Sequence, residues 1–540
     1  MSSVNTGASG STTSTAPAVD ERTRRLVHAV LMPGFTGTSA PPWLLDALRD
    51  GLGSVCYFGH NLESPEQTAA LSERIHAAGR AVIAMDEEGG GVTRLHVRGG
   101  SPHVGAAVLG RADDLALTGA VARGIARDVR AAGIDLALAP VADVNSDPAN
   151  PVIGVRSFGA DPDLVGTHTA AFVTAMQAEG VAACAKHFPG HGDTKVDSHV
   201  GLPVVAVDLE TLRSRDLVPF AGAVEAGVRC VMTSHIVFPA LDSAMATVSP
   251  AVVALLRDGL GFDGVIVSDA ISMLAVAETI GFAESAVRAL AAGVDLVCLG
   301  NPGLPLTGDT PTDEEEFRAV LDAVTRAVAE GRLPVARLEE AAARVHALAD
   351  WTQRARGARG GDVSEASVTS DVTDANAAAA RRALRVRGQV AGSLSGAVRV
   401  VDVRRRRNVA TGRLSDLVAD ALLERLPGST VEAVFARTAT VEGRAQQGDL
   451  TPGEAQDGTA SPGIPADVVL VGTPGSDPAQ DAALARQLAL SPGAVVVCLG
   501  WPGTEDVLSL LLRRLRPRPH QQRHQPGTTS ARAGRRRLHL

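Results

Sequence analysis

The sequence predicts an α/β protein, a (β/α)8 TIM-like barrel followed by a smaller α/β sandwich domain. Short apolar runs alternate with helix-like segments through the first 300 residues, as expected when parallel strands are covered on both faces. Eight such runs match the eight strands of a barrel. They occupy residues 27–31, 54–58, 81–85, 135–139, 182–186, 229–233, 264–268 and 295–299. A doubly wound open sheet is the competing fold, but no GxGxxG motif follows an early strand.

Helical patterns fill the gaps between these strands and follow the last one. The predicted helices cover 64–79, 114–133, 313–331 and 333–351. The second begins at Asp114, a suitable N-cap, and ends at Gly133, which suits the left-handed position after a helix. The stretch 352–375 is rich in Arg, Gly, Ser, Thr and Asp, which is typical of a linker.

A chain of 540 residues exceeds what one core ordinarily holds, so more than one domain is expected. A second αβ pattern begins near residue 390 and indicates the smaller sandwich. Its strand-like runs are 397–403, 430–436, 466–472 and 494–500. The predicted organisation is a disordered leader (1–24), a barrel domain (25–351), a linker and connecting helix (352–389), the sandwich domain (390–512) and a basic tail (513–540).

The C-terminal segment changes character at Arg513. From there to Leu540 the chain holds nine arginines and no acidic residue. Such a tail can bind RNA or an anionic membrane. We favour two simpler interpretations, because hydrophobic periodicity vanishes within an element. One is a disordered end, and the other is a shifted reading frame that replaced the last helices and truncated the sandwich domain.

The composition argues against several classes of protein. Hydrophobic residues make up 45% of the chain and the net charge is −9, so folded domains are expected and nucleic-acid binding is not. The chain has no run of about 18 apolar residues and no signal-peptide pattern, so membrane insertion is not expected. Five widely spaced cysteines without a CxxC pair favour buried free thiols, a reducing cytoplasm and no zinc site. They are Cys56, Cys184, Cys230, Cys298 and Cys498.

Polar residues follow six of the predicted strands. In a (β/α)8 barrel the chemistry lies at the C-terminal ends of the strands, because the loops that leave those ends share one face. Six polar clusters at corresponding ends are hard to obtain by chance, so we expect them to line one cleft. The clusters are Asp86-Glu87-Glu88, Pro140 with Asp143, Lys186-His187, Ser234-His235, Asp269 and Gly300-Asn301.

Asp269 is the strongest single candidate among the carboxylates. It directly follows the apolar strand 264–268, where a side chain would enter the cleft. The structural alternative is an N-cap for the next helix, which an isolated strand–Asp–helix sequence would favour. Because the other strand ends are also polar, we expect a catalytic role.

The segment from Lys186 to Pro203 holds three histidines, two aspartates and both lysines of the chain. Asp197 and His199 are two residues apart, so in an extended segment the carboxylate can bond the imidazole. Such a pair is an acid/base poised near neutral pH. Hydrogen bonds that merely stabilise the loop are the alternative role.

Two other interpretations of this segment stay open. Ser198 makes a serine-nucleophile triad conceivable, although no G-x-S-x-G elbow is present. A metal site is a further competitor, although the spacing of its ligands is irregular. Those ligands would be His187, His191, Asp193 and His199.

Five polar side chains form the mixed-charge set that a sugar requires, since charged groups grip hydroxyls through several hydrogen bonds each. Lys186 suggests a position where arginine would not serve, because nearly every other basic residue is arginine. Taken alone, Arg156 fits an ordinary surface position, and the acidic run 86–88 fits a cation site or an ordinary loop. The set comprises Asp86, Arg94, Arg156, Lys186 and His187.

Four segments resemble family 3 glycoside hydrolases of the bacterial β-N-acetylglucosaminidase (β-N-acetylhexosaminidase) type. They are DEEGGGVTRL, NPVIGVRSFG, KHFPGHGDTKVDSHVGLP and GFDGVIVSDAISM, and they occur in the family's order. The resemblance implies a retaining mechanism with Asp269 as the nucleophile and His199, assisted by Asp197, as the general acid/base. It also implies that the five side chains of the mixed-charge set contact the sugar. The sandwich resembles the C-terminal domain of longer family members, and we expect it to contribute structure or substrate shape.

The resemblance implies a cytoplasmic enzyme that hydrolyses terminal non-reducing N-acetylglucosaminides from the cell wall or chitin through a glycosyl-Asp intermediate. Its partner is a small carbohydrate, and no metal or organic cofactor is implied. Phosphate is an alternative acceptor, because a neutral histidine does not repel an anion. The alternatives are therefore a phosphorylase or a β-glucosidase of the same family and, in another class, a non-catalytic sugar-binding protein.

Overall fold

The structure is a computed structural model of the chain. It describes residues 19–195, 201–302, 311–357, 365–385, 397–404, 417–435, 466–472, 477–492 and 494–500. The predicted basic tail, and the predicted leader up to residue 18, lie outside these residues. Among the helices described, none is both long enough and apolar enough to cross a membrane.

Eight parallel strands form the predicted barrel. Strands β2 to β7 make one sheet in chain order, and β8 pairs with β1. A bridge between Val267 and Leu296 joins β7 to the start of β8, and β1 lies beside β2. The strands are β1 (Leu31–Pro33), β2 (Ser54–Tyr57), β3 (Val82–Met85), β4 (Leu136–Ala137), β5 (Ala182–Phe188), β6 (Cys230–Thr233), β7 (Val265–Ser268) and β8 (Val297–Gly300). The predicted (β/α)8 class is confirmed.

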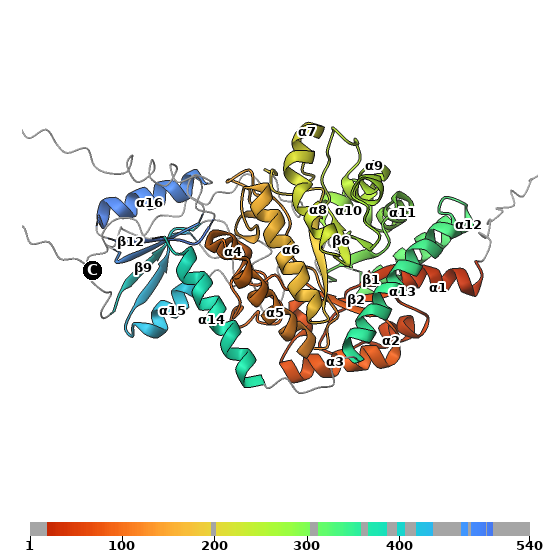
Figure 1. The fold of residues 1–540 in the computed structure, drawn as a ribbon, viewed down its shortest axis with the longest axis horizontal. Coiled ribbons are helices and arrows are strands. Elements are labelled where there is room, and N and C mark those ends of the chain that lie inside the picture. The colour runs from red at the N-terminus through yellow and green to blue at the C-terminus, as the bar shows by residue number, and fades with distance from the viewer. Residues whose placement is uncertain are drawn as a thin grey trace, which may run out of the picture.

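A helix follows each strand and covers the outside of the barrel (Figure 1). The predicted helices 64–79 and 114–133 are present, and Ser64 and Asp114 cap them as acceptors of backbone N–H groups. These helices are α2 (Pro42–Arg49), α3 (Pro65–Ala78), α4 (Ala106–Ala112), α5 (Leu115–Ala131), α6 (Pro162–Ala178), α7 (Leu209–Thr211), α8 (Val218–Glu225), α9 (Pro250–Ala254), α10 (Leu274–Ala277), α11 (Phe282–Ala292) and α12 (Asp313–Ala329). Short 3₁₀ turns lie at Gly59–Asn61, Gly154–Arg156 and Ala246–Val248, and π turns at Leu212–Asp216 and Leu255–Gly259.

The first strand begins later than predicted. Residues 27–31 were expected to form it, but helix α1 covers Glu21–Ala29 and leaves only Leu31 in β1. Asp20 starts the helix by accepting the N–H of Thr23 at 2.7 Å. A short apolar run is compatible with a strand or with the buried face of a helix. Here the N-cap favours the helix.

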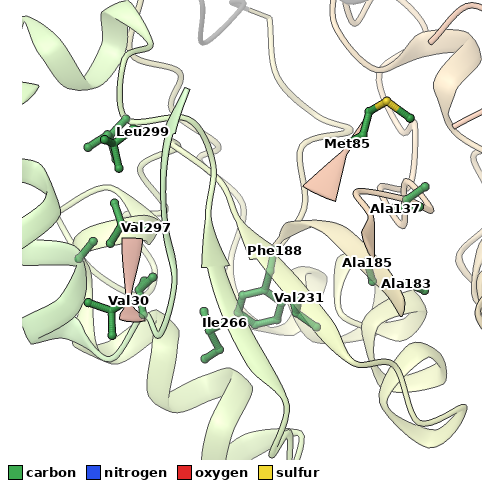
Figure 2. Packing of buried hydrophobic residues seen from close by; sticks show 14 of the residues in the cluster. Val30, Met85, Ala137, Ala183, Ala185, Phe188, Val231, Ile266, Val297 and Leu299 are labelled. Carbon is green, nitrogen blue, oxygen red and sulfur yellow. The ribbon is translucent and has the colours of Figure 1, made fainter. Parts of the chain in front are cut away.

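Alternate residues of each strand face two different apolar layers. On β3, Val82 and Ala84 join the cluster inside the barrel, whereas Ile83 and Met85 join the cluster between strands and helices. Figure 2 shows part of this outer cluster, including Met85, Val231 and Val297. The inner layer is made largely of small and medium side chains, as the low aromatic content requires. It includes four buried, free cysteines, as predicted: Cys56, Cys184, Cys230 and Cys298.

Helix α13 (Val335–Gly357) contributes Val345, Leu348 and Ala349 to the inner cluster, so it closes one end of the barrel. The stretch 352–375 was expected to be a linker. Instead α13 continues to Gly357, and a further helix, α14 (Glu365–Ala383), begins within the stretch. Helix α14 lies beside α4 and α5 (Figure 1).

The second αβ pattern forms a four-stranded parallel sheet in the order β10-β9-β11-β12. Apolar clusters lie on both of its faces, one including residues of α16 and the other a residue of α15. This is the predicted α/β sandwich. Its elements are β9 (Arg399–Asp402), α15 (Leu417–Arg425), β10 (Thr430–Ala433), β11 (Val468–Val471), α16 (Pro478–Leu490) and β12 (Val495–Cys498).

Candidate active site

Lys186, at the end of β5, is the centre of the polar cluster that the sequence predicts. Its Nζ lies 2.7 Å from Asp86 Oδ1 and 2.7 Å from Glu88 Oε1, and its side chain is 2% exposed. Burial alone would lower the pKa of Lys186, but the two carboxylates raise it above its usual value. A compact ammonium on a flexible stem can join two separate carboxylates in this way, which explains why lysine stands here in an arginine-rich chain.

Arg156, on the 3₁₀ turn after β4, completes the buried part of the cluster. Its Nε and Nη2 donate to Glu88 Oε2 and Oε1 at 3.0 and 2.7 Å. Burial would raise the pKa of Glu88, but Arg156 and Lys186 hold it at about 2. Glu88 was part of a strand-end run noted in the sequence, yet no role was assigned to it. Its partner lies 68 residues away, and no local pattern reveals such a contact.

Asp86 and Arg94 are the members of this cluster that reach solvent. Their side chains are 24% and 23% exposed, and Arg94 Nη2 lies 3.4 Å from Asp86 Oδ2. Although burial opposes it, Lys186 and Arg94 hold the pKa of Asp86 well below its usual range. The cluster therefore presents an ionised carboxylate and a guanidinium above a buried, charge-paired floor.

His187 is oriented by Asp143, a buried carboxylate in the segment that follows β4. Asp143 accepts the backbone N–H of His187 through Oδ1 at 3.1 Å and bonds its Nδ1 through Oδ2 at 2.8 Å. The same Oδ1 accepts the backbone N–H of His191 at 2.7 Å. The sequence placed Asp143 at a strand end but gave it no role, and its contacts indicate that it fixes the tautomer and position of His187.

The glycines of the KHFPGHGD turn are required by close approach. A Cβ at Gly192 would lie 1.7 Å from the carbonyl oxygen of Val144, and Gly190 has a φ of 143°. His191 Nδ1 bonds Thr194 Oγ1 at 2.8 Å. Burial, with a smaller effect of His187, lowers the pKa of His191 to about 4. The turn is thus a packed element that carries a neutral histidine.

Three of the four candidate metal ligands contact other protein groups, and the fourth, His199, lies outside the described residues. His187 and His191 bond Asp143 and Thr194, while Asp193 pairs with Arg215 at 3.1 Å. Within the described parts of the chain, no group of three His, Cys, Asp or Glu side chains is arranged to hold a metal ion.

Asp269 follows β7 and is half-buried. Its backbone N–H donates to the carbonyl of Thr233 at 3.2 Å, and its Oδ1 accepts the N–H of Ala270 at 2.8 Å. Burial lowers the pKa of His191, and the charge of Asp269 offsets only a small part of that lowering. Asp269 and His187 both lie at the carboxyl ends of parallel strands, β7 and β5, and therefore at the same end of the barrel.

His235, after β6, supports the backbone beside Asp269. Its Nε2 donates to the carbonyl of Ala270 at 3.0 Å, and its Nδ1 lies 2.9 Å from Thr247 Oγ1. Thr247 also bonds Thr233 Oγ1 at 3.0 Å. The sequence marked the Ser234-His235 strand end without assigning it a role. These buried bonds tie β6 to the segment that carries Asp269.

Asp197 and His199 lie outside the described residues, so their predicted pairing stays a prediction. The structure brings together the other predicted residues. Asp86, Arg94, Arg156 and Lys186 form one charge cluster, and His187 adjoins Lys186 on the same strand end. Ser198, the candidate for a serine triad, also lies outside the described residues.

A barrel whose strands carry convergent charged side chains at their carboxyl ends is typical of enzymes. The profile described as the Glycosyl hydrolase family 3 N terminal domain matches residues 42–348. The chain therefore belongs to glycosyl hydrolase family 3. The predicted family and the predicted class, a glycoside hydrolase, are confirmed.

Proteins similar to this chain are named β-hexosaminidase or β-N-acetylglucosaminidase. A β-hexosaminidase of Xanthomonas oryzae pv. oryzae is 38% identical over 286 residues, which are 51% of this chain and 84% of the relative. β-Hexosaminidase A of Pseudoalteromonas piscicida is 32% identical over 337 residues, or 58% of this chain, and the match spans just 55% of that relative. The solved family 3 β-N-acetylglucosaminidase of Paenibacillus sp. str. FPU-7 is 30% identical, with a TM-score of 0.71 and coverage of 88% of this chain and 89% of that one. This last likeness extends beyond the barrel.

Proposed function

We propose that this protein is a retaining β-N-acetylhexosaminidase that releases terminal non-reducing N-acetylglucosamine from cell-wall or chitin-derived saccharides. The observation that carries the proposal is the charge cluster of Asp86, Arg94 and Lys186 in the same barrel mouth as the carboxylate of Asp269. The names of the relatives support the same substrate class.

In the proposed reaction the Asp269 carboxylate attacks the anomeric carbon while the bond to the leaving oxygen breaks. His199, supported by Asp197, gives a proton to that oxygen. Water then attacks the glycosyl-Asp ester, His199 takes its proton, and Asp269 is released. The role of Asp269 is supported by its position after β7. The roles of His199 and Asp197 rest on the sequence motif.

The mixed-charge set would hold the sugar. Asp86 and Arg94 reach solvent and can bond hydroxyl groups directly. Lys186 has three donors and uses two on Asp86 and Glu88, so one remains for the substrate. We propose that Arg156 binds at the buried floor of the site, and that His187 binds through the ring nitrogen not bonded to Asp143.

A decisive experiment gives the purified full chain aryl β-N-acetylglucosaminide and aryl β-glucoside, each with and without phosphate. We expect aryl release from the N-acetylglucosaminide and N-acetylglucosamine as the sugar product. Phosphate-dependent formation of the sugar 1-phosphate would select a phosphorylase, and preference for the glucoside would select a β-glucosidase. Release from neither substrate would support a non-catalytic sugar-binding protein.

We also propose a cytoplasmic location and the domain limits given above, with the sandwich contributing structure or substrate shape. Free cysteines at all five positions support the location. Fractionation of the source cells, followed by activity and antibody detection, tests it. Recovery of the protein outside the cytoplasmic fraction would refute it.

A further inference from the structure

The loop from Glu87 to Gly105, which carries Arg94, is anchored by the chain around it. Glu87 is 1% exposed, and its Oε2 accepts the backbone N–H groups of Arg94 and Leu95 at 2.8 and 3.1 Å. Glu87 therefore fixes the backbone from which the Arg94 guanidinium reaches Asp86.

Helix α5 holds two points of the same loop through one carboxylate oxygen. Asp128 Oδ2 lies 3.1 Å from His96 Nε2 and 2.9 Å from His103 Nε2. Burial would raise the pKa of Asp128, but hydrogen bonds from His103 and His96 hold it at about 2. His103 in turn accepts the N–H of Gly90 through its carbonyl at 2.8 Å. The loop is thus hydrogen-bonded to α5 at two points, His96 and His103.

Asn376, on helix α14, provides the third anchor. Its Oδ1 accepts the backbone N–H of Val104 at 2.8 Å, and its Nδ2 donates to the carbonyl of Val372 at 2.9 Å. The same Nδ2 lies 3.4 Å from His103 Nδ1. In the tautomer that carries its hydrogen on Nε2, His103 directs this group at Asp128, and its Nδ1 can accept the second amide hydrogen of Asn376. Both polar atoms of the amide side chain therefore have partners at this junction.

The side chains at this junction also pack closely together. A Cβ at Gly124 of α5 would lie 2.5 Å from Val372 Cγ1 and 2.7 Å from His103 Cε1. The glycine lets α14 and the His103 ring meet over α5. Asn376 itself is 9% exposed, and Ala379, one turn further on, is fully buried.

We infer that Asn376 is a positioning residue for the sugar-binding cluster, and that α14 is a part of the binding apparatus. It acts through His103 and Val104 on the loop that carries Arg94. The family match ends at residue 348, before α14 begins at Glu365, so this support comes from outside the matched domain. The inference rests on the proposed function for its substrate, an N-acetylglucosaminide.

The test compares three variants of the full chain with the wild type. Asn376→Leu removes the side-chain bonds at similar volume, and Gly124→Ala disturbs the same junction without removing a hydrogen-bonding group. Arg382→Ala is the matched control, because Arg382 ties α14 to Asp114 at the start of α5, away from the loop. For Asn376→Leu and Gly124→Ala we expect KM for aryl β-N-acetylglucosaminide to rise about tenfold while kcat changes less than about twofold, as when an interaction shared by ground and transition states is lost. Arg382→Ala should leave both constants unchanged.

Amide hydrogen exchange over residues 87–105, measured without substrate, separates this inference from the proposed function. Faster exchange in Asn376→Leu than in Arg382→Ala supports the anchoring even if no N-acetylglucosaminide is turned over, an outcome that would sink the proposed function alone. Should Asn376→Leu fail to fold, Gly124→Ala carries the test. Wild-type KM and exchange in a folded junction variant, or an equal rise of KM in Arg382→Ala, would overturn the inference.

Discussion

At the carboxyl ends of the barrel strands, Lys186 joins the carboxylates of Asp86 and Glu88, and Asp86 stays partly open to solvent. At the amino ends, Asp295 before β8 is fully buried and pairs with Arg257 and Arg337. Both ends hold carboxylates among cations. The first end leaves charged groups accessible to solvent. At the second end the carboxylate is buried and contacts only protein groups.

The closed end is built by α13. Besides its apolar residues, this helix supplies Arg337 and Arg344 to Asp295 and Arg356 to Asp135. Both aspartates also accept a backbone N–H from a neighbouring strand, at Ile266 and at Ile83. Such pairs fix strand register and helix position. Ion pairs of one kind thus stabilise the fold where they are sealed from solvent, and can bind a ligand where they are open to it.

The largest effect should come from Asp269→Asn at the open end. This variant keeps the shape of the side chain but cannot attack the anomeric carbon, so turnover should fall on the order of 10⁴-fold or more. The unfolding free energy should change by less than about 1 kcal/mol, since the site is half-buried and partly solvated. Steady-state kinetics and urea unfolding measure the two quantities. Turnover within tenfold of the wild type would remove Asp269 from the mechanism.

Asp295→Ala at the closed end should show the reverse pattern. It leaves Arg257, Arg337 and Arg344 without their common carboxylate, and breaking a buried pair of this kind costs about 3–5 kcal/mol. We expect the loss in urea unfolding at neutral pH. The kcat of the molecules that remain folded, counted by active-site titration, should stay within about twofold of the wild type. A large fall in kcat without a loss of stability would contradict the division between the two ends.

The sequence predicts most of this architecture because strands covered on both faces are continuous apolar runs. The first run misleads, since 27–31 lies largely in a helix whose buried face is equally apolar. The beginning of helix α14 falls in a stretch that was expected to be a linker, because its buried residues include the small or polar Ala375, Asn376 and Ala379. A hydrophobic pattern places the ends of such a helix poorly, because alanines and an amide supply much of its buried face.

The site was predictable to the extent that chemistry follows strand ends. Asp86, Lys186 and Asp269 could be found in this way, because each comes directly after an apolar run. Glu88 and Asp143 stood in the same places, but their partners Arg156 and His187 are distant in sequence. Only the folded chain shows that these two carboxylates orient other groups and are not themselves the solvent-facing ones.

Acid should lower the stability of the folded protein through His191, which lies at the open end of the barrel. Its folded-state pKa is about 4, whereas an unfolded imidazole titrates near 6.5, so between these values the unfolded chain binds more protons. The unfolding free energy should therefore fall as the pH drops from about 6.5 to about 4, by up to about 3 kcal/mol from this group. His191→Asn, which can still bond Thr194, should flatten that part of the profile. Urea unfolding at several pH values measures it, and an unchanged slope in the variant would show that other groups govern acid sensitivity.

The smallest expected effect is the loss of stability on removal of Arg344, one of three arginines that contact Asp295 at the closed end. Arg344 lies 3.3 Å from Asp295, and its side chain is 23% exposed. When Arg344 is removed, Asp295 still pairs with Arg257 and Arg337. Arg344→Ala should therefore cost less than about 1 kcal/mol of unfolding free energy, as expected for a partly exposed pair. Arg337→Ala is the matched comparison and should cost more, because Arg337 lies 2.6 Å from Asp295 and also donates to the carbonyls of Leu290, Gly293 and Val294. Equal losses in the two variants would mean that Asp295 needs all of its arginines, and that the closed end is held by net charge more than by its individual hydrogen bonds.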